Sequence, residues 1–348
     1  MFINIWKRCR SFMSKKSKKT LNDHLSCLVK SDVRDKSMEP LASSSDTSTV
    51  DPEKHDSVKE TLNSIYATAT ITNKPENQDY RDKITTPLLK SIMLADGLGS
   101  YKYAKESSET AVKTVYEQLH DLKNLEKLDF EAIYKKAHEK LKAMSCQNGN
   151  KSLGDLYGTT LIVLVETERK IKIAYTGNGA IWHIRGNFDD KFHKIFVEGY
   201  PEISITWNAV NLLNPHSVPE NGKEALYRLI SDDTEYDYTP TVIEIDKDKR
   251  HGDIFMICSD GIFSADHTVV RPSKTENIYV KYEMTIKKFF EHLTRFFEAY
   301  KYTDEELNNA INRYLSEVKP DLEDDATMGV LITSKVLDFH NLKKSSDR

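Results

Sequence analysis

Residues 91–100 constrain the fold of this chain more than any other stretch. They include a short unbroken apolar run, residues 92–95, which is typical of a strand with both faces covered. Asp96 and Gly97 follow directly and favour a turn. The sequence therefore predicts that the carboxylate of Asp96 lies at the end of a buried strand.

The same pattern of an apolar run beside an acid occurs twice more. Residues 254–258 are apolar and end at Asp260, and Asp324 stands just before the apolar run 328–332. A fourth acid, Asp79, ends a polar loop, residues 73–79, which is expected to lead into the strand that contains the first run. Singly, each is an ordinary turn or strand-end aspartate. Together they offer oxygen ligands on rigid elements, which is what a hard divalent cation requires.

Composition limits the classes of function. The chain has 348 residues, of which 39% are hydrophobic and 30% are charged, with a formal net charge of -4. Ten Lys or Arg and three Asp or Glu fall in residues 1–36, so the remainder is strongly acidic. An acidic body repels a polyanion, and we therefore expect no nucleic-acid substrate.

Four scattered cysteines suggest neither a disulfide framework nor a structural zinc site, because they form no CxxC pair: Cys9, Cys27, Cys146 and Cys258. No apolar run approaches the roughly 18 residues that a membrane-spanning helix needs. The sequence therefore predicts a cytoplasmic protein. Its oligomeric state is not predicted.

Three segments are expected along the chain. Residues 1–56 are predicted to be a basic tail and a flexible linker, 57–336 a folded domain, and 337–348 a C-terminal tail. Two interpretations of the basic tail stay open: a short helix that contacts an anionic membrane or a partner weakly, or a solubilising extension.

The periodicity of the domain predicts strands, two helices, strands, two helices and a final strand. Residues 197–238 show no clear period, which is unusual unless such a stretch frames a site. Runs of strands between helix pairs favour an α+β fold with antiparallel sheets. The expected strands are 68–72, 88–95, 159–165, 171–176, 180–185, 241–245, 254–258 and 328–332, and the expected helices lie near 104–119, 129–144, 286–297 and 303–314.

Six short motifs resemble, in order and spacing, those of the metal-dependent protein phosphatases of type 2C. The resemblance covers about residues 60–334 and implies that 57–336 is a catalytic domain of this type. The implied fold is a four-layer αββα sandwich, with two central antiparallel sheets flanked by helix pairs. The motifs are Asn77-Gln78-Asp79, Leu94-Ala95-Asp96-Gly97-Leu98-Gly99, Gly158-Thr159-Thr160, Ala174-Tyr175-Thr176-Gly177-Asn178-Gly179, Cys258-Ser259-Asp260-Gly261 and Asp324-Asp325-Ala326-Thr327.

The resemblance also implies a role for each candidate site residue. Asp96 would bridge two Mn²⁺ or Mg²⁺ ions, Gly97 would offer its backbone carbonyl to one ion, and Asp260 and Asp324 would hold the other. Asp79 would act through bound water. The implied reaction is hydrolysis of a phosphoserine or phosphothreonine in a protein substrate by a water that bridges the metals.

A lysine stands where the resemblance implies a phosphate-gripping arginine. Lys74 lies three residues before Asn77, and it supplies positive charge without the bidentate geometry of a guanidinium. We therefore assign Lys74 to substrate binding and catalysis.

The chain departs from the family pattern at two further positions. Leu98 replaces a residue that is commonly histidine or methionine, and Leu98 cannot donate a proton to the leaving group. Asn178 replaces an aspartate that serves a third, weaker metal site in many members. The alternative is therefore a catalytically impaired relative that binds phosphorylated partners or acts as a scaffold.

Overall fold

The computed structural model describes residues 62–147, 155–185, 193–195, 203–205, 209–220, 223–263, 267–272, 277–281 and 284–346. The chain divides into two units, Met1–Ser57 and Val58–Arg348, and every described residue belongs to the second. The predicted basic tail and linker at 1–56 therefore lie outside the described residues. Among the helices that are described, none is both long and apolar enough to cross a bilayer.

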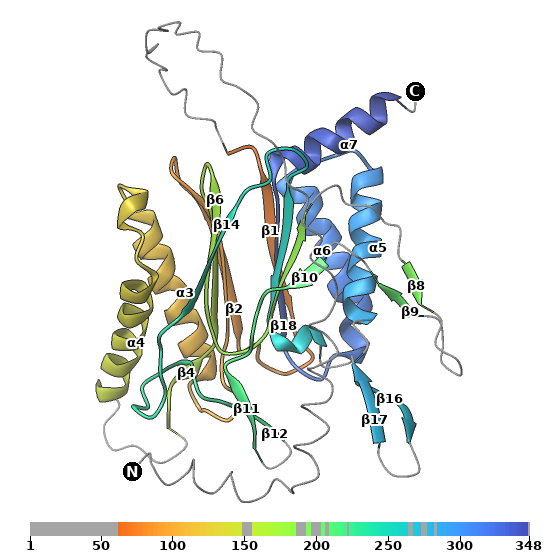
Figure 1. Ribbon diagram of the computed structural model, residues 1–348. Helices are drawn as coiled ribbons and strands as arrows, with labels where there is room; N and C mark the ends of the chain where they lie inside the picture. The colour runs from red at the N-terminus through yellow and green to blue at the C-terminus, as the bar shows by residue number, and fades with distance from the viewer. Residues whose placement is uncertain are drawn as a thin grey trace, which may run out of the picture. The chain divides into compact units, whose positions relative to one another are not determined.

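Two five-stranded antiparallel sheets form the centre of the second unit (Figure 1). The first sheet consists, in spatial order, of β1 (Ile65–Ile71), β18 (Ala326–Ile332), β15 (Asp253–Cys258), β7 (Ala180–Arg185) and β10 (Ala209–Asn211). The second consists of β14 (Thr241–Asp246), β6 (Lys170–Thr176), β5 (Leu161–Glu166), β3 (Lys90–Asp96) and β2 (Asp79–Thr85).

A pair of helices covers the outer face of each sheet. Helices α3 (Ala104–His120) and α4 (Phe130–Gln147) pack on the second sheet, and α5 (Met284–Glu298) and α6 (Asp304–Val318) pack on the first (Figure 1). The predicted α+β fold with its four-layer αββα sandwich is thereby confirmed.

Strand β3 shows why its apolar run is unbroken. Ile92 and Leu94 lie in the layer between the sheets, whereas Met93 and Ala95 pack under α3 and α4. Successive side chains of a strand point to opposite faces, so a strand covered on both faces needs apolar residues at every position. Strand β15 alternates in the same way between the inter-sheet layer and the helices of the first sheet.

Two helix starts follow the capping signals of the sequence. The side chain of Asp129 accepts a hydrogen bond from the backbone N–H of Ala132 at 3.0 Å, just before α4. The hydroxyl of Thr303 accepts one from Glu306 N–H at 3.2 Å and opens α6. Both caps satisfy backbone donors that the first turn of a helix leaves unpaired.

Strand β2 was not predicted. Residues 73–79 were expected to form a polar loop that leads to a strand at 88–95, but a strand already begins at Asp79 and pairs along β3. Because β2 is the edge strand of its sheet, charged residues such as Arg81 and Lys83 are tolerated in it, and the apolar alternation is weak. Asp79 therefore lies on a strand rather than in a loop.

The stretch 197–238 also contains strands where no period was found. Its described strands have two to four residues each, too short to show alternation. They are β9 (Ile203–Ile205), β10, β11 (Ser217–Glu220), β12 (Lys223–Leu226) and β13 (Ile230–Ser231).

The remaining elements are short: η1 (Leu125–Lys127), β4 (Gly158–Thr159), β8 (His193–Ile195), η2 (Asp260–Phe263), β16 (His267–Pro272), β17 (Asn277–Lys281) and η3 (Lys319–Asp321). Small two-stranded sheets pair β8 with β9, β11 with β12, β13 with β4, and β16 with β17.

The C-terminal boundary differs from the prediction. Helix α7 (Ser334–Ser346) runs through most of the segment that was expected to be a tail. Val336 and Leu337 are buried in the same apolar cluster as α5 and α6. The predicted division between 336 and 337 therefore falls inside a packed helix.

Candidate active site

Asp79 and Asp96 are brought together by the pairing of β2 with β3. The first residue of β2 is the cross-strand partner of the last residue of β3, so the two aspartates stand side by side at one end of the second sheet. Thr160 fixes the backbone of Asp96, since its hydroxyl accepts from Asp96 N–H at 3.1 Å and its own N–H donates to Asp96 O at 2.8 Å.

Asp260 and Asp324 are brought together by the pairing of β15 with β18 in the first sheet. Asp260 follows the end of β15 and Asp324 precedes the start of β18. The two strands are antiparallel, and Ser259 N–H donates to Thr327 O at 3.0 Å beyond their last paired residues. The end of β15 and the start of β18 therefore bring both acids to the same edge of the sheet.

Hydrogen bonds join these ends of the two sheets. The hydroxyl of Ser259 donates to Oδ2 of Asp79 at 2.8 Å, and the backbone N–H of Gln78 donates to Oδ2 of Asp325 at 2.8 Å. Strand ends from both sheets thus meet, and aspartates from four separate parts of the sequence lie at one site.

Gly97 and Gly261 allow the backbone to approach closely at this site. A Cβ on Gly97 would lie 2.2 Å from the backbone oxygen of Ala104, the first residue of α3. A Cβ on Gly261 would lie 1.8 Å from the backbone oxygen of Asp325. Any side chain at either position would move α3 or the Asp324 loop away from the site.

Asn178 reaches the site from the turn between β6 and β7. The flanking residues, Gly177 and Gly179, have φ values of 94° and 110°, in the region that favours glycine. From this turn the Nδ2 group of Asn178 donates to Oδ2 of Asp260 at 2.6 Å. Asn178 thus contacts one of the predicted metal ligands directly.

Burial makes the aspartates at the centre of the site costly to ionise. Burial raises the pKa of Asp79 to about 7, although hydrogen bonds from Thr327 and Ser259 oppose the shift. Burial also raises the pKa of Asp96 well above its usual range, and the neighbouring charges of Asp79 and Asp260 raise it further. Like charges this close favour a bound cation or a shared proton.

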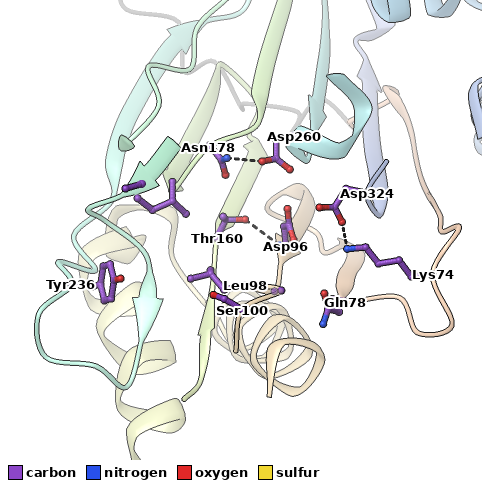
Figure 2. A pocket seen from close by; sticks show the side chains of 14 residues that line it. Lys74, Gln78, Asp96, Leu98, Ser100, Thr160, Asn178, Tyr236, Asp260 and Asp324 are labelled. Atoms are coloured by element: carbon purple, nitrogen blue, oxygen red, sulfur yellow. Dashed lines mark hydrogen bonds and ion pairs between the residues drawn. The ribbon is translucent and has the colours of Figure 1, made fainter. Parts of the chain in front are cut away.

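Lys74 approaches the acids from the loop between β1 and β2. Its Nζ group forms an ion pair with Oδ1 of Asp324 and lies 3.8 Å from Oδ2 of Asp325 (Figure 2). The Lys74 and Asp324 side chains are 35% and 49% exposed, whereas that of Asp325 is 1% exposed. The residue predicted to grip a substrate phosphate therefore contacts a predicted metal ligand.

These groups surround a pocket of about 340 Å³. Figure 2 shows the acids and Lys74 on one side and Tyr236 on the opposite side, with Leu98 and Ser100 between them. The pocket is lined by Lys74, Gln78, Asp96, Gly97, Leu98, Gly99, Ser100, Thr160, Asn178, Ala225, Leu226, Tyr236, Asp260 and Asp324.

The donor set suits a hard divalent cation, although the side chains are not arranged around an ion. Oδ1 of Asp79 is buried and accepts no hydrogen bond, and its neighbour Asp96 could donate one only when protonated. Carboxylate oxygens of this kind are ligands for Mn²⁺ or Mg²⁺. Yet within the described part of the chain, no group of three or more His, Cys, Asp or Glu side chains has metal-binding geometry.

Existing hydrogen bonds account for part of this difference. Asp324 is engaged by Lys74, and Asp260 is engaged by Asn178. Both bonds would have to loosen before the two carboxylates could turn toward a common ion. The residue types and their common location thus fit a divalent cation, whereas the side-chain directions of Asp260 and Asp324 are those of a hydrogen-bonded site.

Two contributors to the site were missed by sequence reasoning. Asp325 was read only as part of a motif, yet its buried carboxylate accepts from Gln78 and from the hydroxyl of Thr72. Tyr236 lies in the stretch that showed no period, and no local signal marks it as a pocket residue. The adjacent acids Asp324 and Asp325 could have indicated that one of them has a role other than metal binding, since the side chains of two neighbouring residues do not easily face the same ion.

Two solved structures of phosphatases share this fold. A bacterial serine phosphatase matches with a TM-score of 0.53 and 13% identity, covering 78% of this chain and 98% of its own. The serine/threonine phosphatase of S. agalactiae matches with a TM-score of 0.50 and 15% identity, covering 77% of this chain and 100% of its own. At these identities the likeness shows the fold alone.

The family assignment rests on the sequence. No curated protein matches the chain. The family model of protein phosphatase 2C matches residues 67–316, more than half of the 348 residues and a range that contains Lys74, Asp79, Asp96 and Asp260. The chain therefore belongs to the protein phosphatase 2C family.

Proposed function

We propose that this chain hydrolyses phosphoserine or phosphothreonine in proteins and depends on Mn²⁺ or Mg²⁺ for that activity. The observation that carries the proposal is the meeting of two buried carboxyl groups, Asp79 and Asp96, in which a protonated Asp96 is the one donor open to Oδ1 of Asp79. Burying negative charge without a positive partner costs free energy. A bound divalent cation would supply the positive charge that the neighbouring side chains do not.

Five groups would hold the ions. By resemblance, Asp96, the backbone carbonyl of Gly97, Asp260 and Asp324 would hold the ions directly, and Asp79 would do so through water. When bound, such ions lower the pKa of a water and neutralise charge on the phosphoryl oxygens. The buried carboxyl groups, whose pKa values are raised, would ionise when they take up the ions and would then hold negative charge at a fixed place.

The remaining residues of the pocket bind and orient the substrate. Lys74 offers its ammonium group to the phosphate, as the charge of a phosphoryl group requires. Leu98 cannot move a proton, so the leaving oxygen takes its proton from water. The acidic residues around the pocket disfavour a nucleic acid, whose neighbouring phosphates they would repel. A cytoplasmic location and a phosphoprotein partner follow from this proposal and from the cysteine pattern.

Release of inorganic phosphate from a phosphothreonine peptide tests the proposal. We expect turnover in Mn²⁺, none in a chelator, and loss of turnover in Asp96→Asn. An exposed acid far from the pocket, Glu126, offers the control variant Glu126→Gln, which should behave as the parent does. Metal-independent turnover, or full activity in Asp96→Asn, would rule the proposal out.

The second candidate, a catalytically impaired relative, is favoured by two specific contacts. Lys74 and Asn178 occupy predicted ligand oxygens of Asp324 and Asp260. Such a protein would bind a phosphopeptide without cleaving it, or bind fewer than two equivalents of Mn²⁺. Calorimetry with Mn²⁺ and with the uncleaved peptide separates this candidate from the active enzyme.

A further inference from the structure

The contact between Lys74 and Asp324 brings two predicted functions into conflict. One role of the ammonium group is to bind the substrate phosphate, and one role of the carboxylate is to bind an ion. In the structure the two groups are paired with each other (Figure 2). Neither can perform its role until the pair separates.

The loop that carries Lys74 is anchored to the segment that carries Asp324. The backbone N–H of Lys74 donates to the hydroxyl of Thr72 at 2.9 Å, and that hydroxyl donates to Asp325. The side-chain amide of Asn73 donates to the backbone oxygens of Lys319 and Leu322, at 2.7 Å and 3.0 Å. Three bonds thus tie this loop to the 319–325 segment, and a fourth fixes the backbone of Lys74 within the loop, all independently of the ion pair itself.

The charges around Lys74 favour this resting position. Burial lowers the pKa of Lys74, but the bond to Asp324 and the charges of Asp324, Asp325 and Asp96 outweigh it and raise the pKa above its ordinary value. The ammonium group is therefore held in its charged form by the acids it faces. Among the described residues that line the pocket, Lys74 carries the only formal positive charge.

We propose that Lys74 is an internal counter-ion of Asp324, which one divalent cation must displace before the site is complete. This inference rests on the proposed function. When a cation binds the Asp324 oxygen, it repels the positively charged ammonium group of Lys74. The ammonium group then moves toward the pocket, where it can bind a substrate phosphate. Binding of the ion and binding of the phosphate are then coupled through one side chain.

The coupling predicts an unequal pair of ions. An ion held by Asp96 and Gly97 need not displace Lys74, whereas an ion at Asp324 must do so. The second binding event should therefore be weaker than the first. Substrate phosphate should tighten it, because phosphate stabilises the released position of Lys74.

Titration calorimetry of the metal-free full chain with Mn²⁺ tests this coupling. The variant Lys74→Met keeps an unbranched side chain of similar length and removes the charge. The matched control is Lys105→Met, because Lys105 is also exposed near the site but pairs with Glu76 at 3.0 Å and not with Asp324. Thermal melting verifies that each variant is folded.

We expect Lys74→Met to bind the weaker Mn²⁺ about tenfold more tightly, since one unit charge close to an ion readily changes its affinity by that factor. Lys105→Met should change it by less than about threefold, as a screened surface charge does. In an Asp324→Asn background the effect of Lys74→Met should vanish. A phosphopeptide assay should show a raised KM together with a lowered Mn²⁺ requirement, which a loss of structure would not produce.

The outcomes separate the inference from the function on which it rests. Equal Mn²⁺ affinity of the parent and Lys74→Met overturns the inference and leaves the phosphatase proposal intact. The inference also fails if Lys105→Met tightens binding as much, or if the effect persists without Asp324. If neither the parent nor Lys74→Met binds Mn²⁺, the proposed function itself is wrong.

Discussion

Both ends of the central sheets bury acidic residues, but the two ends differ in how many partners compensate the charge of those acids. At the end remote from the pocket, Glu166 is fully buried and its carboxylate bonds to Lys247 Nζ at 2.6 Å and to the hydroxyl of Ser64. At the pocket end of the same sheet, Asp79 and Asp96 face each other, and one oxygen of Asp79 accepts no hydrogen bond.

Strand β15 repeats this contrast along its own length. Its first residue, Asp253, is fully buried and accepts from Asp248 N–H at 2.7 Å while it pairs with His183 at 2.8 Å. Past its other end lies Asp260, close enough to Asp96 to raise the pKa of that residue. Burial alone therefore does not identify a functional acid. The number of partners that compensate the charge distinguishes a structural carboxylate from one that awaits a cation.

The largest expected effect comes from Asp96→Asn. We expect phosphatase activity to fall on the order of 10³-fold or more, because the residue that bridges the ions is lost. The metal-free variant should nevertheless be more stable than the metal-free parent, by about 1 to 3 kcal/mol, since the raised pKa of Asp96 makes folding of the parent costly at neutral pH and an amide avoids that cost. Chemical denaturation in a chelator measures the second effect. If the metal-free variant were less stable than the parent, Asp96 would be an acid that stabilises the fold, as Glu166 is, and the comparison would be contradicted.

Glu166→Gln should give the opposite result at the remote end. The variant leaves Lys247 without its charged partner, and we expect a loss of about 2 to 3 kcal/mol in the free energy of unfolding. Activity per folded molecule should stay at the parent level, since no contact joins Glu166 to the pocket in the described residues. The same denaturation series, with an assay below the melting range, checks both statements. Lost activity with unchanged stability would contradict the comparison.

Asn178→Asp makes the pocket end more acidic. The substitution removes the hydrogen bond to Asp260 and adds a carboxylate, and we expect the metal-free protein to lose about 1 to 2 kcal/mol of stability. Mn²⁺ should recover that loss, because a ligand of the folded state stabilises it by mass action. Melting curves with and without Mn²⁺ measure the difference. An Asn178→Asp protein that Mn²⁺ stabilises no more than the parent would show that position 178 does not face the ions.

The smallest effect concerns His216, a compensated group near the pocket end. Its Nδ1 accepts from Gly177 N–H at 3.3 Å and its Nε2 bonds to the hydroxyl of Thr241 at 2.8 Å, so the ring is neutral. Burial, helped by the charge of Arg228, lowers the pKa of His216 below 6.5. The unfolded chain thus takes up a proton first, and stability is lost as the pH falls below about 6.5.

Melting temperatures between pH 7.5 and pH 5 test this dependence. His216→Gln keeps an acceptor for Gly177 but cannot titrate, so its loss of stability on acidification should be shallower than that of the parent. The surface variant His120→Gln is the control and should follow the parent curve. Identical slopes for the parent and His216→Gln would remove His216 as the cause.

Sequence reasoning found the acids because their strands are covered on both faces. An unbroken apolar run that ends at Asp96 or Asp260 is visible in the sequence, and the structure places both residues at the pocket. The edge position of β2 concealed its strand, so Asp79 was assigned to a loop. The helix cap at Thr303 was predictable because both of its partners lie within one turn.

Contacts between distant segments could not be predicted from local pattern. Lys74 and Asp324 are 250 residues apart, and nothing in either neighbourhood indicates that they pair. The same holds for Ser259 and Asp79, which join the two sheets across 180 residues. Such contacts depend on how the sheets face each other, which periodicity does not describe.

The central claim is that the aspartates at the pocket end gather divalent cations. Anomalous diffraction from crystals grown with Mn²⁺ tests it most directly. We expect two anomalous peaks in the pocket, within about 2.0 to 2.6 Å of carboxylate oxygens of Asp96, Asp260 and Asp324. Well-ordered aspartates without anomalous density between them, at a Mn²⁺ concentration that saturates any turnover, would contradict the claim.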